Sequence, residues 1–305
     1  MKISKVFLTA LIAVSAASCN KNVSTELQSP ENFSDDAVAG KKVLFVIVDG
    51  LVGSEVKAIA PTNITNYAQG AIFSYDGIGS YTNDSISNAY GWTSLLTGVQ
   101  VEKHNVRTAD FAGNNLDIYP SIFTKLKAVK PNVQTVAVTT SQVIADHLLA
   151  DAKEKFVLSS DKDAIAKAEG ILKTSNPDFL ITQLSGVDSA GANADYAATN
   201  TVYADAVNRT DAYIGGLVKT IQGRSNFNKE EWLVVISSGK GANTRYVPVG
   251  KTWNAFEDKM HNTFIMYYNP RFINKQYNKP TGVNPYVGTG YNFKSGRSSQ
   301  PLRSA

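Results

Sequence analysis

The chain has 305 residues, of which 43% are hydrophobic and 18% are charged, and its formal net charge is +4. This length and composition allow one large folded domain or two small ones, each with a buried core. The small net charge, without a clustered stripe of lysine and arginine, excludes nucleic acid as an expected partner.

The first 18 residues have the pattern of a secretory signal peptide. Lys2 and Lys5 precede an apolar run at residues 6–14, and small residues follow up to Cys19. The apolar run is too short to span a bilayer, so residues 1–18 are left out of the predicted fold. Cys19 is the only cysteine, which excludes a disulfide within the chain.

The position of Cys19, directly after the small residues, resembles the lipobox of bacterial lipoproteins. This resemblance implies that Cys19 is lipidated and attaches the protein to a membrane of the bacterial cell envelope, at the outer membrane or cell surface. Residues 19–40 are polar and lack an apolar period, as expected of a tether between the lipid and a folded body.

Six apolar runs predict the strands of one sheet. The first, residues 42–50, is unbroken and rich in β-branched and aromatic residues, which is typical of a strand buried on both faces of a parallel sheet. The other five runs lie at residues 135–140, 155–160, 178–184, 231–238 and 262–268.

Helical patterns lie between these strands, at residues 119–130, 142–150, 161–174 and about 193–222. In the last of them a stripe that includes Tyr196 and Val202 is expected to be buried. The alternation predicts an α/β domain over residues 41–270, with a mostly parallel sheet sandwiched by helices. Residues 271–305 are rich in Asn, Gly, Ser, Pro and Tyr and predict either a loop-rich edge or a loose tail.

Two strands end in residues that suggest a functional site, because groups at the carboxyl ends of parallel strands meet at one edge of the sheet. Asp49 follows the first strand, where an aspartate either caps the next helix or binds a metal. Gly239 and Lys240 follow the strand at 231–238 in the sequence SGKG. A phosphate-binding P-loop is excluded, since its lysine is followed by Ser or Thr and here Gly241 follows.

Seven segments together resemble one enzyme family. They are VLFVIVDGL, APTNITNYAQGAIF, GWTSLLTGVQVEKHNV, FLITQLSGVDSAGA, DAYIGGLVKTI, WLVVISSGKG and HNTFIMYYNP, which cover about residues 42–270. In order and spacing they resemble the alkaline phosphatase superfamily, specifically its type I phosphodiesterase and nucleotide pyrophosphatase branch. The resemblance implies an alkaline phosphatase-like fold and a family of phosphoric-ester hydrolases.

In active members of this family, two metal ions, usually zinc, are held by three carboxylates and three histidines, and a Thr or Ser attacks phosphorus. Carried over to this chain, the nucleophile position falls on Asn88, whose neutral amide is no nucleophile. Ser85 or Ser87 would replace it only in a shifted register.

The metal-ligand positions are only partly retained. Asp49 and Asp188 match two of the ligand carboxylates. Ala192 stands at a ligand histidine, Gly239 at a ligand carboxylate and Lys240 at a second ligand histidine.

The three histidines of the chain do not fill these gaps. His104 lies in a turn that is structural in the family, and His147 is expected to pack within an apolar helix. His261 would reach the site only if its loop folds back. Two carboxylates without a histidine make a poor zinc site, so no cofactor is expected, or at most a weakly held magnesium or calcium ion.

Lys240 suggests a replacement for the metal. If Asp49 and Asp188 converge, their charges repel, and an ammonium within about 6 Å would relieve the repulsion. The alternative is that Lys240 extends into solvent from a glycine-flanked loop.

Three functions follow as hypotheses. The first is a lipid-anchored pseudoenzyme that binds a glycan, a phosphorylated ligand or an envelope protein without hydrolysis. The second is an active phosphodiesterase or phosphatase with a rearranged site that uses Asp49, Asp188 and a serine between residues 85 and 94. The third is a surface scaffolding module, which exposed aromatics near residues 277–292 would favour.

Overall fold

The computed structural model describes residues 40–251, 253–269 and 272–283. The expected signal peptide, Cys19 and nearly all of the tether lie outside these residues. The strands are β1 (Gly40–Val48), β2 (Ala71–Ile78), β3 (Thr135–Thr139), β4 (Glu154–Val157), β5 (Phe179–Leu184), β6 (Glu230–Ser237), β7 (Asn262–Tyr268) and β8 (Lys275–Gln276).

The α-helices are α2 (Gly53–Ile59), α3 (Thr62–Tyr67), α4 (Asn88–Thr97), α5 (Val101–His104), α6 (Ile122–Val129), α7 (Gln142–His147), α8 (Asp161–Thr174), α9 (Gly186–Asn193) and α10 (Thr201–Gln222). Within the described residues, no helix combines the length and the apolar character that crossing a bilayer requires.

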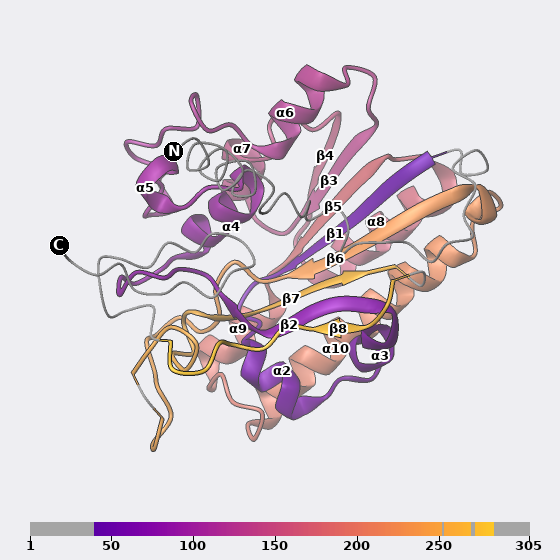
Figure 1. Ribbon diagram of the computed structural model, residues 1–305. Helices are drawn as coiled ribbons and strands as arrows, with labels where there is room; N and C mark the ends of the chain where they lie inside the picture. The colour runs from indigo at the N-terminus through magenta and orange to yellow at the C-terminus, as the bar shows by residue number, and fades with distance from the viewer. Residues whose placement is uncertain (1–39, 252, 270–271, 284–305) are drawn as a thin grey trace, which may run out of the picture. The chain divides into compact units, whose positions relative to one another are not determined.

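The strands form one sheet in the order β4-β3-β5-β1-β6-β7-β2-β8 (Figure 1). The central pairs, β1 with β5 and β1 with β6, are parallel, whereas β7 runs antiparallel to both β6 and β2. The predicted mostly parallel sheet with flanking helices is therefore confirmed. The parallel centre matters for function, because it brings the carboxyl ends of β5, β1 and β6 side by side.

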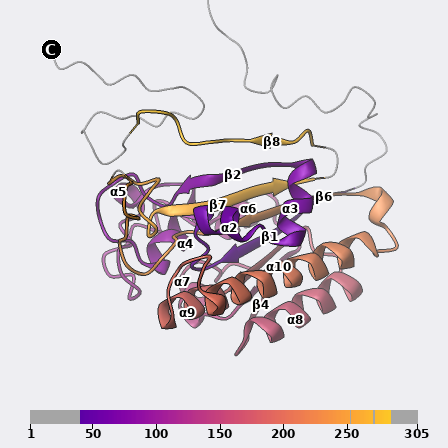
Figure 2. The same cartoon turned by 90° about the horizontal axis from the view of Figure 1, so that it is seen from below.

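One face of the sheet carries the larger core. Helices α8 and α10 lie next to each other in a layer against this face (Figure 2). Apolar side chains of β1, β5, β6 and β7 pack there against α2, α3, α8 and α10. Asp211 of α10 accepts the backbone N–H groups of Asn63 and Ile64, at 2.9 and 2.8 Å, and so ties the first turn of α3 to α10.

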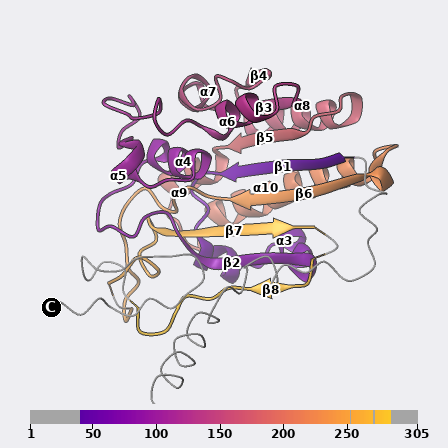
Figure 3. The same ribbon diagram turned by 45° about the horizontal axis from the view of Figure 1, so that its top comes forward.

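The opposite face is covered over only part of its width. Helices α4, α6 and α7 pack on β3, β5 and β1 through a second cluster that includes Trp92, Phe123 and Ile181 (Figure 3). Of the helices that the structure describes, none is drawn in front of this face of β6 and β7 (Figures 1 and 3). Val43 and Phe45 of β1, which are expected to be fully buried, are half-buried for this reason.

The helix predicted over residues 193–222 is α10, which begins only at Thr201; the first part of the predicted range is irregular. α9 ends at Asn193, and α10 begins after Asn200, whose side-chain oxygen caps it by accepting the N–H of Val202 at 3.0 Å. The prediction of one buried stripe is wrong at Val202, which is 52% exposed. Tyr196 is buried, but it lies between the two helices.

Residues after 270 contribute to the sheet. Strand β8 pairs in parallel with β2, with Ile72 opposite Lys275. The Tyr277 N–H then donates to Phe73 O at 2.8 Å, and Ser74 Oγ donates to Tyr277 O at 2.6 Å. The described part of this segment is thus a sheet edge with loops.

Candidate functional site

Three charged side chains meet where the parallel strands end. Asp49 follows β1, Asp188 lies in the first turn of α9 after β5, and Lys240 lies three residues after β6. Lys240 Nζ is 3.2 Å from Asp188 Oδ1, and both side chains are nearly buried. The ammonium therefore lies well within the distance expected of a group that offsets carboxylate repulsion, and the alternative of a solvent-directed lysine is wrong.

Asp188 is fully engaged by the protein. Its Oδ1 also accepts the Tyr196 hydroxyl at 2.6 Å, and its Oδ2 accepts Asn88 Nδ2 at 2.9 Å. Lys240 Nζ makes a further bond of 2.5 Å to Asn243 Oδ1. These contacts hold both the lysine and the carboxylate in fixed positions.

Asn88, at the position that the resemblance assigns to the nucleophile, is the first residue of α4. The helix is capped by Ser87, whose Oγ accepts the Tyr90 N–H at 3.1 Å. Asn88 Oδ1 is buried and makes no hydrogen bond with any described residue. The amide thus acts as a donor to Asp188, a role that its chemistry allows.

Asp49 is surrounded by neutral donors. Trp92 Nε1 donates to its Oδ1 and Gln183 Nε2 to its Oδ2, both at 2.7 Å. Burial raises the pKa of Asp49 to about 7, and the nearby charge of Asp188 adds to this, while the bonds from Trp92 and Gln183 oppose it. Asp49 therefore titrates near neutral pH.

This titration should appear in the stability of the protein. The pKa of Asp49 is raised from 3.8 in the unfolded chain to about 7, so the folded state binds the proton more tightly. The protonated carboxyl contributes stability that is complete below pH 4 and is lost as the pH rises to 7, by up to about 4 kcal/mol. Urea denaturation of the wild type and Asp49→Asn from pH 4.5 to pH 8 checks this. We expect the difference between their unfolding free energies to change with pH; parallel profiles would contradict the assignment.

The substituted position Gly239 is enclosed by backbone. A Cβ on Gly239 would lie 2.6 Å from the Gly91 carbonyl carbon, and one on Gly91 would lie 2.5 Å from the Gly239 carbonyl carbon. Gly79 also approaches, since its Cβ would lie 2.5 Å from Gly239 O. The strand end and helix α4 thus touch at a point where only glycine fits. Ala192, another of the three positions at which the resemblance implies a lost ligand, is exposed on α9.

The histidines lie elsewhere or are otherwise engaged. His104 is buried; its Nδ1 accepts the Val106 N–H at 3.0 Å and its Nε2 lies 3.0 Å from Ser94 Oγ. Burial lowers the pKa of His104 to about 4, which agrees with a structural role. His261 is buried with its Nδ1 3.2 Å from Asp258 Oδ2.

The prediction for His147 is wrong. It is exposed at the end of α7 instead of packed inside the domain, and its ring stacks on Phe111 with centroids 4.1 Å apart.

The residues at the site do not fit a zinc ion. Both oxygens of Asp49 and both of Asp188 already accept hydrogen bonds from side chains of the protein. Within the described residues, no group of three or more His, Cys, Asp and Glu side chains is arranged to hold a metal. Two engaged carboxylates lack the nitrogen or sulfur donors that zinc prefers.

Three partners of the carboxylates were not predicted from the sequence, namely Trp92, Gln183 and Tyr196. Gln183 carries a recognisable signal, because it is the one amide side chain in a mostly apolar strand. Its Oε1 also accepts the Thr139 hydroxyl at 2.5 Å. Tyr196 follows Asp188 by eight residues in an irregular segment, and no periodicity points to it.

The cluster is closed to solvent. Asp49 is 2% exposed and Lys240 3%. Arg245, in the loop after Lys240, donates to Asn83 O at 2.8 Å and to Asp258 Oδ2 at 3.0 Å. It thereby joins the loop that precedes α4 to the loop that follows β6.

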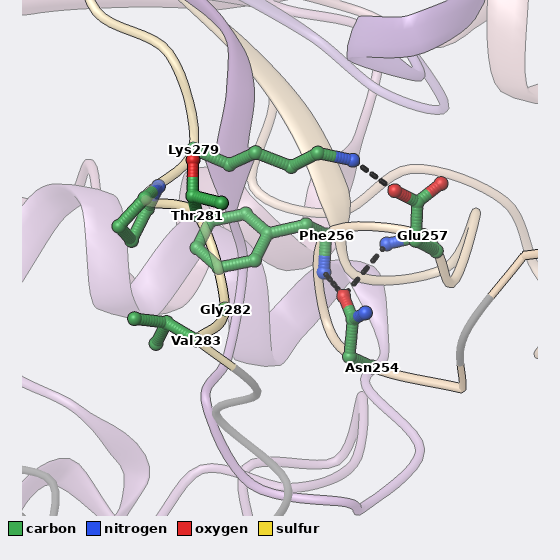
Figure 4. Close-up of a pocket in the computed structure, with 8 residues that line it drawn as sticks. Asn254, Phe256, Glu257, Lys279, Thr281, Gly282 and Val283 are labelled. Atoms are coloured by element: carbon green, nitrogen blue, oxygen red, sulfur yellow. Dashed lines mark hydrogen bonds and ion pairs between the residues drawn. The ribbon is translucent and has the colours of Figure 1, made fainter.

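A separate cavity of about 380 Å³ lies among the loops near β8. Figure 4 shows Lys279 extending toward Glu257, with which it forms an ion pair, and Asn254 Oδ1 accepting the N–H groups of Phe256 and Glu257. The polar groups that the figure connects are thus used within the protein. Tyr277 nearby is 49% exposed; most of the aromatics expected near residues 277–292 lie outside the described residues.

Comparison with known proteins identifies the fold. No protein-family model and no curated protein matches the sequence. Murine ectonucleotide pyrophosphatase/phosphodiesterase 5, an inactive form in complex with AMP, matches with a TM-score of 0.55 and 12% identity, over 78% of this chain and 91% of that chain. A 2-O GAG sulfatase matches with a TM-score of 0.55 and 12% identity, over 77% and 67% of the two chains.

A protein of the alkaline phosphatase superfamily from Vibrio parahaemolyticus matches with a TM-score of 0.52 and 14% identity, over 82% of this chain and 69% of that chain. The neighbours are alkaline phosphatase superfamily members, phosphodiesterases and sulfatases among them. The alkaline phosphatase-like fold expected from the seven sequence segments is therefore confirmed.

Proposed function

We propose that this protein is a lipid-anchored pseudoenzyme of the bacterial cell envelope, which keeps the alkaline phosphatase-like fold but does not hydrolyse phosphoric esters. It serves as a binding module for a glycan, a phosphorylated ligand or an envelope protein. The observation that carries the proposal is the buried ion pair of Lys240 with Asp188, two residues at positions that the sequence resemblance assigns to metal ligands.

The buried ammonium of Lys240 supports the loss of hydrolysis, because it supplies next to Asp188 the positive charge that a metal ion would otherwise supply. Two-metal hydrolysis requires ions that stabilise both the attacking and the leaving oxygen. A lysine fixed to Asp188 and Asn243 supplies one positive charge and leaves no coordination position for water or phosphate. Asn88 offers no attacking oxygen.

Two of the three serines near Asn88, Ser87 and Ser94, are committed to structural bonds, which disfavours a rearranged active site that uses either of them. Ser87 Oγ donates to Arg107 O at 2.9 Å while it caps α4, and Ser94 Oγ lies 3.0 Å from His104 Nε2. Ser85 is exposed on the loop before the helix.

Hydrolysis assays test the proposal directly. The purified full-length chain is offered chromogenic phosphodiester, phosphomonoester and sulfate ester substrates with and without added zinc, and its metal content is measured. We expect no turnover, with wild type and Asp49→Ala indistinguishable. Stoichiometric zinc together with turnover that Asp49→Ala abolishes would overturn the proposal in favour of an active metal-dependent enzyme.

The membrane anchor rests on the pattern of residues 1–19 and needs its own measurement. We expect the wild type to label with a palmitate analogue and to fractionate with membranes, and Cys19→Ser to do neither. Equal labelling of both proteins would remove lipidation at Cys19 from the proposal.

A further inference from the structure

A second cavity lies on the face of the sheet that the helices leave partly open. It has a volume of about 450 Å³ and runs between α6 and the outer face of β1, β6 and β7. This volume is within the range of small-molecule sites, roughly 300–1,000 Å³. We refer to it as the sheet groove. None of the residues that line it belongs to the Asp49, Asp188 and Lys240 cluster.

The floor of the sheet groove is apolar because of the strand register. Val43 pairs with Leu233 and Phe45 with Val235 on the parallel strands β1 and β6, and Val235 pairs with Tyr267 on β7. Paired residues point to the same face of a sheet, so these five side chains form a continuous apolar strip.

The wall of the groove is also apolar. Ile122 and Leu126 lie one turn apart on α6, and Leu95 of α4 completes the wall. All three are partly buried against the second core cluster. The strip and the wall together form one contiguous, half-exposed apolar surface. Such contiguous surfaces are typical of binding sites, whereas scattered exposed apolar residues are not.

One end of the groove carries an excess of positive charge, with Glu231, which pairs in register with Lys41, as the acid on the same face of the sheet. Lys41, at the start of β1, and Lys130, directly after α6, line this end, and both are exposed. Neither ammonium has an ion-pair partner among the described residues. The acid that also lines this end, Asp178, is already used: its Oδ1 is 3.6 Å from Lys42 Nζ and its Oδ2 accepts the Gln134 N–H at 2.9 Å.

We propose that the sheet groove binds a single-chain amphiphile with an anionic head, such as a free long-chain fatty acid. The apolar strip would take the alkyl chain, and Lys41 and Lys130 would take the carboxylate, since a charged hydrogen bond at an apolar boundary is stronger than a neutral one. A neutral alkyl ligand would leave both ammoniums unused, and a cationic one would be repelled. This site goes beyond the proposed loss of hydrolysis and does not depend on it.

Binding of a matched pair of ligands tests the proposal. The full-length chain is titrated with decanoate and with 1-decanol, each below the concentration at which it aggregates. We expect saturable binding of one decanoate, about tenfold or more tighter than decanol, because charge assistance strengthens the hydrogen bonds to the head. The double variant Lys41→Gln/Lys130→Gln should lose this preference and keep the binding of decanol. As a control, Lys57→Gln/Lys162→Gln removes the same charge at exposed positions that do not line the groove.

A second variant addresses the apolar strip. Leu233→Trp should fill the groove and abolish binding of both ligands, with a circular dichroism spectrum that matches the wild type. If Leu233→Trp does not fold, the ligand preference of the lysine variants still decides. Absence of saturable decanoate binding by the wild type would overturn the proposal. This is the result expected if a second copy or another protein segment covers the groove. A ligand preference that the Lys41 and Lys130 substitutions leave unchanged would overturn it as well.

Discussion

Gly239→Asp should destabilise the folded protein strongly instead of rebuilding a metal ligand. The new Cβ would meet the Gly91 backbone at 2.6–2.7 Å, a distance that requires the strand end or helix α4 to move. The new carboxylate would be buried, and Lys240, its neighbour in the chain, is already held by Asp188. Overpacking and an unpaired buried charge together should cost about 4 kcal/mol or more.

Thermal and urea denaturation of the purified variant measure this loss. Gly170→Asp is the matched control, because it adds the same side chain at a glycine whose Cβ would meet open space. We expect the control to remain within about 0.5 kcal/mol of the wild type. If Gly239→Asp is as stable as the wild type, the strand end and helix α4 can move apart to accept a side chain. Steric exclusion by Gly91 would then not explain why position 239 carries no carboxylate.

Lys240→Ala should destabilise the protein and make its stability depend on divalent cations. Removal of the ammonium leaves Asp188 buried with only the Asn88 amide and the Tyr196 hydroxyl as donors. Breaking a buried ion pair at one end typically costs about 3 kcal/mol or more. If the lysine replaces a metal ion, millimolar magnesium or calcium should then raise the melting temperature of the variant and leave that of the wild type unchanged.

The double variant Asp188→Asn/Lys240→Met separates the ion pair from simple packing. With both charges removed, much of the lost stability should return, and the response to cations should disappear. Lys57→Ala, which removes an exposed lysine on α2, controls for the change in net charge. An equal response of Lys57→Ala and Lys240→Ala to magnesium would contradict the replacement of a metal by Lys240.

The sequence predicted the strands that are buried on both faces and the helices that bury one face. The unbroken apolar runs locate β1 and β6 to within two residues, and α8 occupies the predicted residues 161–174 because its apolar period is clear. The sequence did not predict α4 as a helix from its periodicity, since seven of its ten residues are buried and no polar face remains. Strand β2 was missed because its pairing with β7 is interrupted between Ser74 and Gly77.

The sequence predicted the charged residues of the candidate site, but not the neutral residues that bind them. Asp49, Asp188 and Lys240 follow strands, so the topology alone brings them together. Trp92 and Tyr196 reach the same point from a helix and from an irregular segment, and their contacts depend on tertiary packing that no local pattern encodes. The contact of Gly91 with Gly239 joins residues 148 positions apart and depends on the absence of side chains.

The two outer strands of the sheet limit the ways in which this protein can bind other protein chains. β4 has the sequence EKFV and is largely exposed, and β8 has only two residues, Lys275 and Gln276. Short, charged outer strands are poor templates for the backbone of another chain. Recognition by strand addition is therefore disfavoured at both ends of the sheet, and copies crowded together on one surface should remain separate. A protein partner is instead expected to be bound through side-chain contacts, on a face of the domain or on its loops.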